Sequence, residues 1–379
     1  MRINPKSKFI VVALAASSVL ILSACSNASS STKSAPTPSV DPFVKSVEAS
    51  VSAMQAVQTS WTGPTSGPVA SKGKHLIFLS GQQSNSLDAA YGGYLQAAAK
   101  KVGWSVSVID GQGTPTGWLS GMNQAIARHP DGIVIFADAT SLAVPIAAAT
   151  AAHIPVIGLH ASATTGPGSG LFTNIQEDAG LIGQAEADYA IASSNGTARV
   201  IIDTHNEYAI AGIKSSAMKA EIAKCTGCKL LSFVNFPAAE ASSRMAQLAT
   251  SWVSSYGANF YAMTVGDNDW DFAVPALSAG GAPKTVKLIG SDGTAAAYAR
   301  IRSGQYQVAT VPEPAQEEAY FAIYQMNLAF HGQAASSWVP PIYLVTQQNI
   351  GAEGGDKNVF DPSNNYQAHF TNLLTTGSN

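Results

Sequence analysis

The sequence has few charged residues, few cysteines and no long apolar run beyond its N-terminal region. Of its 379 residues 12% are charged, the formal net charge is −3, and no basic block follows the N-terminal region. Because nucleic-acid binding requires a basic face, we expect no nucleic-acid partner. Gly, Pro, Asp or His interrupts each later apolar run, so none is long enough to span a bilayer. We therefore predict a water-soluble body.

The first 25 residues carry the pattern of an export signal. Basic residues precede an apolar run over residues 9–22, and Leu22-Ser23-Ala24-Cys25 closes it. The run is too short for a mature transmembrane helix, and its end resembles a lipobox, whose cysteine is diacylated and becomes the new N-terminus. We predict a lipoprotein signal over residues 1–24 and an extracytoplasmic protein held at the cell membrane only by a lipid on Cys25. An ordinary secretory signal is the alternative.

The other two cysteines, Cys225 and Cys228, lie three residues apart around a Gly-containing turn. Exported proteins keep such pairs oxidised, so we predict a local disulfide. Redox catalysis would need the pair at the start of a helix, whereas here it follows a predicted helix and precedes a predicted strand. Two thiolates without a nearby His pair also make a weak zinc site. We expect no metal site and no cofactor.

Composition divides the rest of the chain into a tether and a folded body. Residues 25–40 are mostly Ser, Ala, Thr, Pro and Asn, which predicts a flexible tether. Residues 41–73 are predicted to form a helix over 42–58, capped by Asp41, and a turn-rich linker.

From Lys74 onward, strand and helix patterns alternate. The predicted strands cover residues 75–79, 104–109, 132–136, 155–159, 199–203, 229–233, 260–265, 286–290 and 307–311. The predicted helices cover residues 88–102, 118–128, 142–152, 178–193, 208–224, 242–256, 272–280 and 295–304. Such alternation predicts parallel sheets with crossover helices. The residue count favours an α/β protein of two Rossmann-like lobes over a single doubly wound sheet.

Polar and aromatic residues follow the predicted strands, where ligands bind in open α/β sheets. Planar polar groups suit paired hydrogen bonds to vicinal hydroxyls, and aromatic faces suit the C–H faces of a sugar ring, so we predict a sugar or polyol site. Trp270 either caps this pocket or packs under its loop. The predicted ligand-binding residues at strand ends are Gln82, Asn85, Asp88, Asp138, His160, Tyr208, Asp267, Asn268, Asp269, Trp270, Asp292 and Glu313.

Motifs of the common enzyme classes are not found in the sequence. It has no dinucleotide-binding Gly-x-Gly-x-x-Gly after the first strand, no phosphate-binding loop, no Gly-x-Ser-x-Gly elbow and no His-Glu-x-x-His pair. Asp267 and Asp269 are a candidate carboxylate pair for glycoside hydrolysis, but two acids so spaced more often cap and begin a helix. We expect no enzymatic activity.

Several segments together resemble the type I periplasmic sugar-binding proteins of ABC importers, the group of the ribose- and xylose-binding proteins. The most specific are Leu288-Ile-Gly-Ser-Asp-Gly-Thr294 and the stretch from Arg300 to Pro314, ending Thr-Val-Pro-Glu-Pro. The resemblance covers residues 74–349. It implies two lobes, residues 74–174 with 314–342 and residues 175–313 with 343–379. It also implies a three-strand hinge near residues 174–177, 313–314 and 342–345.

The same resemblance implies that Lys214 is a ligand-binding residue, because it takes the place of an arginine in the second lobe. It also implies roles for Asn85 and Asp88 in the first loop, for Asp292, and for Glu313 in place of a glutamine. His160-Ala161 replaces the Asp-Arg of the ribose binders, so pentose identity does not carry over. The acidic residues of the predicted site leave three kinds of ligand open, namely a larger sugar, a polyol or an amine-bearing compound.

The resulting prediction is a monomeric, lipid-anchored receptor that delivers a sugar or polyol to an ABC permease and its ATPase. The alternatives are a sensory receptor of the same fold and an extracellular carbohydrate hydrolase.

Overall fold

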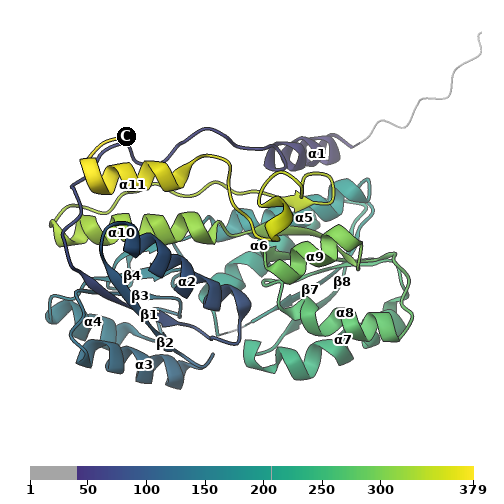
Figure 1. Ribbon diagram of the computed structural model, residues 1–379. Helices are drawn as coiled ribbons and strands as arrows, with labels where there is room; N and C mark the ends of the chain where they lie inside the picture. The colour runs from purple at the N-terminus through teal and green to yellow at the C-terminus, as the bar shows by residue number, and fades with distance from the viewer. Residues whose placement is uncertain (1–40, 206) are drawn as a thin grey trace, which may run out of the picture. The chain divides into compact units, whose positions relative to one another are not determined.

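The structure, a computed structural model, describes residues 41–205 and 207–379 (Figure 1). The predicted signal, the lipidation site Cys25 and the tether lie outside the described residues. The predicted βα alternation is confirmed. Its strands form two mainly parallel six-stranded sheets, each covered by helices on both faces.

The first sheet has the strand order β2-β1-β3-β4-β6-β5, parallel except for β5. Its strands are β1 (His75–Ser80), β2 (Ser105–Asp110), β3 (Gly132–Ile135), β4 (Val156–Leu159), β5 (Gly166–Gly168) and β6 (Leu171–Ile175). Successive side chains of a strand point to opposite faces. Leu76 and Phe78 of β1 accordingly pack under one helix layer, and Ile77 and Leu79 pack under the other. We call this sheet with its helices the first lobe.

Five helices cover the first sheet, in two layers. The helices α2 (Ser86–Lys101), α10 (Ala315–Phe330) and α11 (Tyr366–Thr376) share one core, and α3 (Pro115–Ala127) and α4 (Ala143–Ala151) share the other. No helix was predicted for α10, which is buried on nearly all sides. Its apolar residues therefore show no one-sided periodicity.

The second sheet, with its helices the second lobe, has the order β12-β11-β10-β9-β7-β8. Its strands are β7 (Arg199–Thr204), β8 (Lys229–Asn235), β9 (Phe260–Met263), β10 (Val286–Asp292), β11 (Gln307–Pro312) and β12 (Val345–Thr346). One face carries α1 (Pro42–Met54), α5 (Ala179–Ser193) and α6 (Ala209–Lys224), and the other carries α7 (Ala241–Tyr256) and α8 (Asp269–Ala279). Helix α9 (Ala295–Ser303) packs in a smaller cluster with residues in β12 and on either side of it. Two short 3-10 helices, Ala238–Glu240 and Gly355–Lys357, complete the elements.

The chain passes between the lobes in three segments. Residues 176–178 lead from β6 to α5, residues 313–314 lead from β11 to α10, and residues 331–344 lead from α10 to β12. The predicted lobe assignment of residues 343–379 is wrong for α11. After β12 the chain returns to the first lobe, because Phe370 and Leu373 of α11 are fully buried in the core of α2 and α10.

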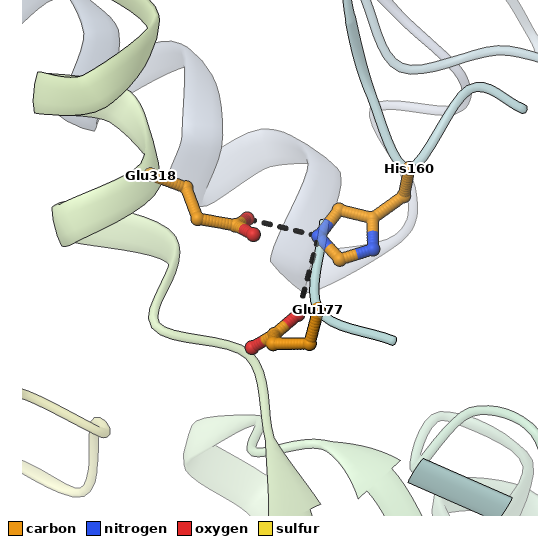
Figure 2. A group of neighbouring side chains, drawn as sticks. All are labelled: His160, Glu177 and Glu318. Carbon is orange, nitrogen blue, oxygen red and sulfur yellow. Dashed lines mark hydrogen bonds and ion pairs between the residues drawn. The ribbon is translucent and has the colours of Figure 1, made fainter. Parts of the chain in front are cut away.

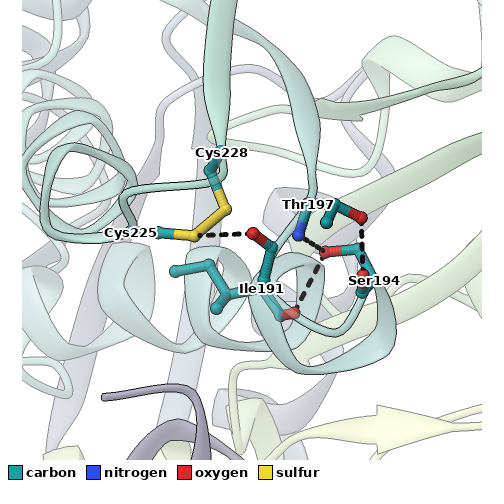
Figure 3. The surroundings of a disulfide bond; sticks show 6 residues. Ile191, Ser194, Thr197, Cys225 and Cys228 are labelled. Atoms are coloured by element: carbon teal, nitrogen blue, oxygen red, sulfur yellow. Dashed lines mark hydrogen bonds between the residues drawn. A yellow bond between two sulfur atoms is a disulfide. The ribbon is translucent and has the colours of Figure 1, made fainter. Parts of the chain in front are cut away.

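Helix α1 is part of the folded body. Asp41 accepts a hydrogen bond from the Phe43 amide, as its predicted capping role requires, and Val44, Val47 and Val51 are buried against the second lobe. The predicted Cys225–Cys228 disulfide is present in the turn after α6, where Cys225 Sγ lies 3.3 Å from the carbonyl oxygen of Gly196 (Figure 3). In the described part of the chain, none of the helices combines the length and apolar character needed to cross a membrane.

Candidate functional site

A cavity of about 370 Å³ lies at the carboxyl ends of strands from both sheets. Its lining contains residues from both lobes, as a site at the carboxyl edges of two parallel sheets requires. The predicted site residues that line it are Gln82, Asn85, Asp88, His160, Tyr208, Lys214, Asn268, Asp269, Asp292 and Glu313.

The structure places three predicted site residues outside the cavity lining. Asp138 accepts hydrogen bonds from the amide and hydroxyl of Ser141. Asp267 is fully buried, and Gln307, Thr310 and the Gly293 amide donate to its carboxylate, so it fixes the loop beneath the site.

Trp270 is fully buried in the second-lobe core, and its indole N–H donates to the Ile289 carbonyl. Of the two roles considered for Trp270, packing under the loop is correct. Aromatic groups reach the cavity from other positions. Phe136 of the first lobe and Phe272 of the second both line it, and Phe272 is 37% exposed.

His205 lines the cavity although it was not among the predicted site residues. Its Nε2 lies 3.1 Å from Asp269 Oδ2, and its Nδ1 lies 3.1 Å from the Phe236 carbonyl oxygen. Both ring nitrogens thus face acceptors, which requires the imidazolium form. Burial opposes the charge, but the Asp269 carboxylate outweighs it and raises the pKa of His205 to about 9. Because His205 follows β7, strand-end position was a signal that could have found it.

Lys214 supplies a buried cation on α6. Its Nζ lies 3.4 Å from Glu313 Oε1, 3.7 Å from Asp292 Oδ1 and 3.1 Å from the Ser291 hydroxyl oxygen. Burial lowers the pKa of Lys214, but the two carboxylates outweigh this effect and shift it upward. Helix α6 approaches α5 closely because Gly183 of α5 has no side chain. A Cβ at Gly183 would lie 2.0 Å from the Lys214 carbonyl oxygen.

Asp292 and His160 both stand at strand ends with left-handed backbone, at φ 99° and φ 51° respectively. Such conformations are costly for residues other than glycine and concentrate at functional sites. Burial raises the pKa of Asp292 well above its usual range, against the opposing effect of Lys214. Both residues line the cavity.

The first loop supplies a third acid. Asp88 Oδ2 accepts a hydrogen bond of 2.6 Å from the Gln82 amide, and burial raises the pKa of Asp88 well above its usual range. Asn85 caps α2, because its side chain accepts from the amides of Leu87 and Asp88. The cavity therefore offers acceptors and donors from both lobes and apolar rings beside them.

Comparison with known proteins identifies the family of the chain. The family model described as periplasmic binding protein domain matches residues 76–334. The chain belongs to this family. None of the curated proteins compared with the chain is similar enough to match.

Solved structures of low sequence identity share the fold. One is an ABC transporter solute-binding protein from Agrobacterium vitis with bound α-D-tagatopyranose, at 16% identity and TM-score 0.67, with 76% of this chain and 99% of that chain covered. A second Agrobacterium vitis protein, with bound allitol, has 18% identity and TM-score 0.64, covering 74% and 97%. A solute-binding protein from Mycobacterium smegmatis with bound glycerol has 19% identity and TM-score 0.66, covering 76% and 99%.

Proposed function

We propose that the protein is an extracytoplasmic solute-binding protein that captures a sugar or polyol between its lobes and delivers it to an ABC permease and its ATPase. The observation that carries this proposal is the cavity itself, which both lobes line with polar groups at strand ends. Its volume of about 370 Å³ lies within the range of small-molecule sites. The structural neighbours bound to tagatopyranose, allitol and glycerol support the solute class.

The lining suits a neutral, hydroxyl-rich ligand. Asp88 and Asp292 can accept hydrogen bonds from hydroxyl groups, while the side-chain amide of Asn268, which lines the cavity, can donate to hydroxyl oxygens. Two of the carboxylates in the lining have cationic partners, since Asp269 pairs with His205 and Asp292 with Lys214. These two acids therefore do not by themselves call for an amine.

Contacts between the lobes support capture by closure. The Tyr208 ring of the second lobe lies 5.3 Å from that of Trp118 in the first, measured between centroids. Closure around a solute hides it from water and presents a different surface to a membrane partner. The proposal also includes a lipid on Cys25 and the tether, because an anchored receptor stays close to its permease. It includes a monomeric state as well.

Hydrolysis is not favoured. Only Asp269 of the Asp267–Asp269 pair lines the cavity, and Asp267 is fully occupied by hydrogen bonds from the loop beneath it. A glycosidase needs two carboxyl groups flanking one bond. The Asp267–Asp269 pair therefore does not support turnover.

The test is isothermal titration of the purified protein with a panel of sugars and polyols, after a thermal-shift screen. We expect one bound solute per chain. The Asp88→Asn and Asp292→Asn variants should bind it at least about tenfold more weakly, because each replaces an acceptor oxygen with an amide group that donates.

Asp41→Asn is the matched control, since asparagine caps a helix as well as aspartate and Asp41 is exposed outside the cavity. Unchanged affinity in both cavity variants, or release of a cleaved product, would contradict the proposal. Stimulation of the permease ATPase by the loaded protein tests delivery.

A further inference from the structure

Three carboxylates converge on one imidazole nitrogen behind the cavity. His160 Nε2 lies 2.9 Å from Glu318 Oε2, 3.4 Å from Glu313 Oε2 and 3.9 Å from Glu177 Oε2. Figure 2 shows Glu177 and Glu318 approaching this nitrogen from different segments of the chain. All four side chains are at most 3% exposed. We call these four residues the hinge cluster.

The hinge cluster has more carboxylate oxygens than there are hydrogen-bond donors around it. A single imidazole N–H can donate to only one of the three carboxylates. Among the described residues, Glu177 Oε2 and Glu313 Oε2 have no hydrogen-bond partner, although both are buried and lie near His160 Nε2. Lys214 contacts only the other oxygen of Glu313. Unpartnered carboxylates are costly to bury, so one further positive charge would stabilise the cluster.

We propose that the hinge cluster is a binding site for one divalent transition-metal ion, ligated by His160 Nε2 and one oxygen each of Glu177, Glu313 and Glu318. Four ligands at metal–ligand distances of about 2.0–2.2 Å in a tetrahedron are separated from one another by about 3.3–3.6 Å. The three distances from Nε2 span that value, at 2.9, 3.4 and 3.9 Å. The ligand atoms of His160, Glu177 and Glu318 also lie within 4.8 Å of one another.

The chemistry of the donors selects the kind of metal. Calcium and magnesium prefer sites made only of oxygen, so the imidazole disfavours them. One imidazole with three carboxylates suits Zn²⁺ or Mn²⁺. Tyr91 donates from its hydroxyl to Glu318, which would orient that carboxylate as an outer partner of the ion.

The position of the cluster gives the ion an entry path and a structural role. His160 and Glu313 also line the cavity, so an ion enters from the cleft. Glu177 and Glu313 stand in two of the segments that pass between the lobes, and His160 follows β4 of the first lobe. A bound ion would fasten both crossing segments to the first sheet. The inference does not depend on which solute the cavity binds.

The test is equilibrium dialysis of chelator-treated protein against MnCl₂ and against ZnCl₂, with bound metal counted by mass spectrometry. We expect one ion per chain at neutral pH. Glu177→Gln and Glu318→Gln should each weaken binding at least about tenfold, since each removes a charged ligand. Glu317→Gln is the matched control, because this neighbouring buried glutamate instead accepts a hydrogen bond from Asn364.

Absence of binding by wild-type protein at micromolar metal overturns the proposal, and so does equal binding by all three variants. If a variant does not fold, the electron spin-echo spectrum of Mn²⁺ bound to wild-type protein decides. Coupling to one directly bound imidazole nitrogen supports the site, and a spectrum of oxygen ligands alone rejects it.

Discussion

The Ser86 hydroxyl of the first lobe lies 3.3 Å from Asn268 Oδ1 of the second and donates a hydrogen bond to it. Asn268 lines the cavity, and Ser86 begins α2 directly after the cavity residue Asn85. This bond links the two lobes beside the ligand site, so it forms only when the lobes are together.

Removing that bond should weaken the closed form. For Ser86→Ala we expect a loss of about 1 kcal/mol of closing energy, hence about fivefold weaker solute binding, measured by titration calorimetry. Ser303→Ala is the control, because the Ser303 hydroxyl bonds only within its own helix and turn. Equal affinities for the two variants would show that the Ser86–Asn268 bond does not contribute to closure.

The pKa of His205 predicts a loss of stability at alkaline pH. A group whose pKa is raised on folding stabilises the protein below its unfolded value of about 6.5, and the effect is lost as the pH rises through the folded value. For His205 the folded value is about 9. The difference between the folded and unfolded pKa values corresponds to about 3 kcal/mol of stability. The difference in free energy of unfolding between wild type and His205→Gln should therefore shrink by about that amount from pH 6 to pH 10. Urea titrations at both pH values measure it, and a constant difference would argue against the imidazolium form.

Lys214→Met should strongly destabilise the second lobe. Removing one partner of a buried ion pair leaves uncompensated charge on Asp292 and Glu313 and costs about 3–5 kcal/mol. Chemical denaturation provides the measurement. Lys219→Met on the same helix is the control, since Lys219 is exposed over the Phe233 ring. Similar losses in the two variants would contradict a special role for Lys214.

Gly183→Ala should separate α5 from α6. The added methyl would overlap the Lys214 backbone, and we expect a cost of about 1–3 kcal/mol with weaker solute binding, because Lys214 shifts. Gly212→Ala is the matched control, since a Cβ there meets nothing within 4 Å. The two variants are compared by thermal unfolding, and an equally stable Gly183→Ala protein would show that the helices are free to move apart.

Loss of the disulfide should leave the site intact. The bond closes a loop of only a few residues, so the chain-entropy estimate is about 2 kcal/mol. Cys225→Ser with Cys228→Ser should lower the melting temperature by a few degrees and leave solute affinity within twofold. A large loss of affinity would instead show that this turn influences solute binding in the cavity.

The sequence predicted the regular part of the fold because strands and helices with one buried face have a visible period. Helix α10 escaped prediction because it has no exposed face. Helix α11 belongs to the lobe whose hydrophobic core it packs into, and the local sequence pattern does not show which core that is. The strand β5 is Gly166–Gly168, too short and glycine-rich to carry a strand signal.

In the site, most of the residues predicted from strand-end positions line the cavity, but the directions of their side chains were not predicted. The predicted helix began at residue 272, whereas α8 begins at Asp269, so Trp270 is helical and turns into the core. Strand-end position pointed to His160 and Glu313 of the hinge cluster, but it did not point to Glu177 or Glu318. Glu177 and Glu318 are separated by 141 positions, and only the folded chain brings them to His160.

The segment after α1 ties the two lobes together on its own. The Leu344 amide donates to the Met54 carbonyl, which fixes the end of α1 beside β12 on the second lobe, yet Trp61 stacks on His369 and packs edge-on against Phe370 in the first. Residues 55–60 therefore act as a short strap whose length limits how far the lobes can swing apart. Lengthening this strap would widen the opening without altering any residue that lines the cavity.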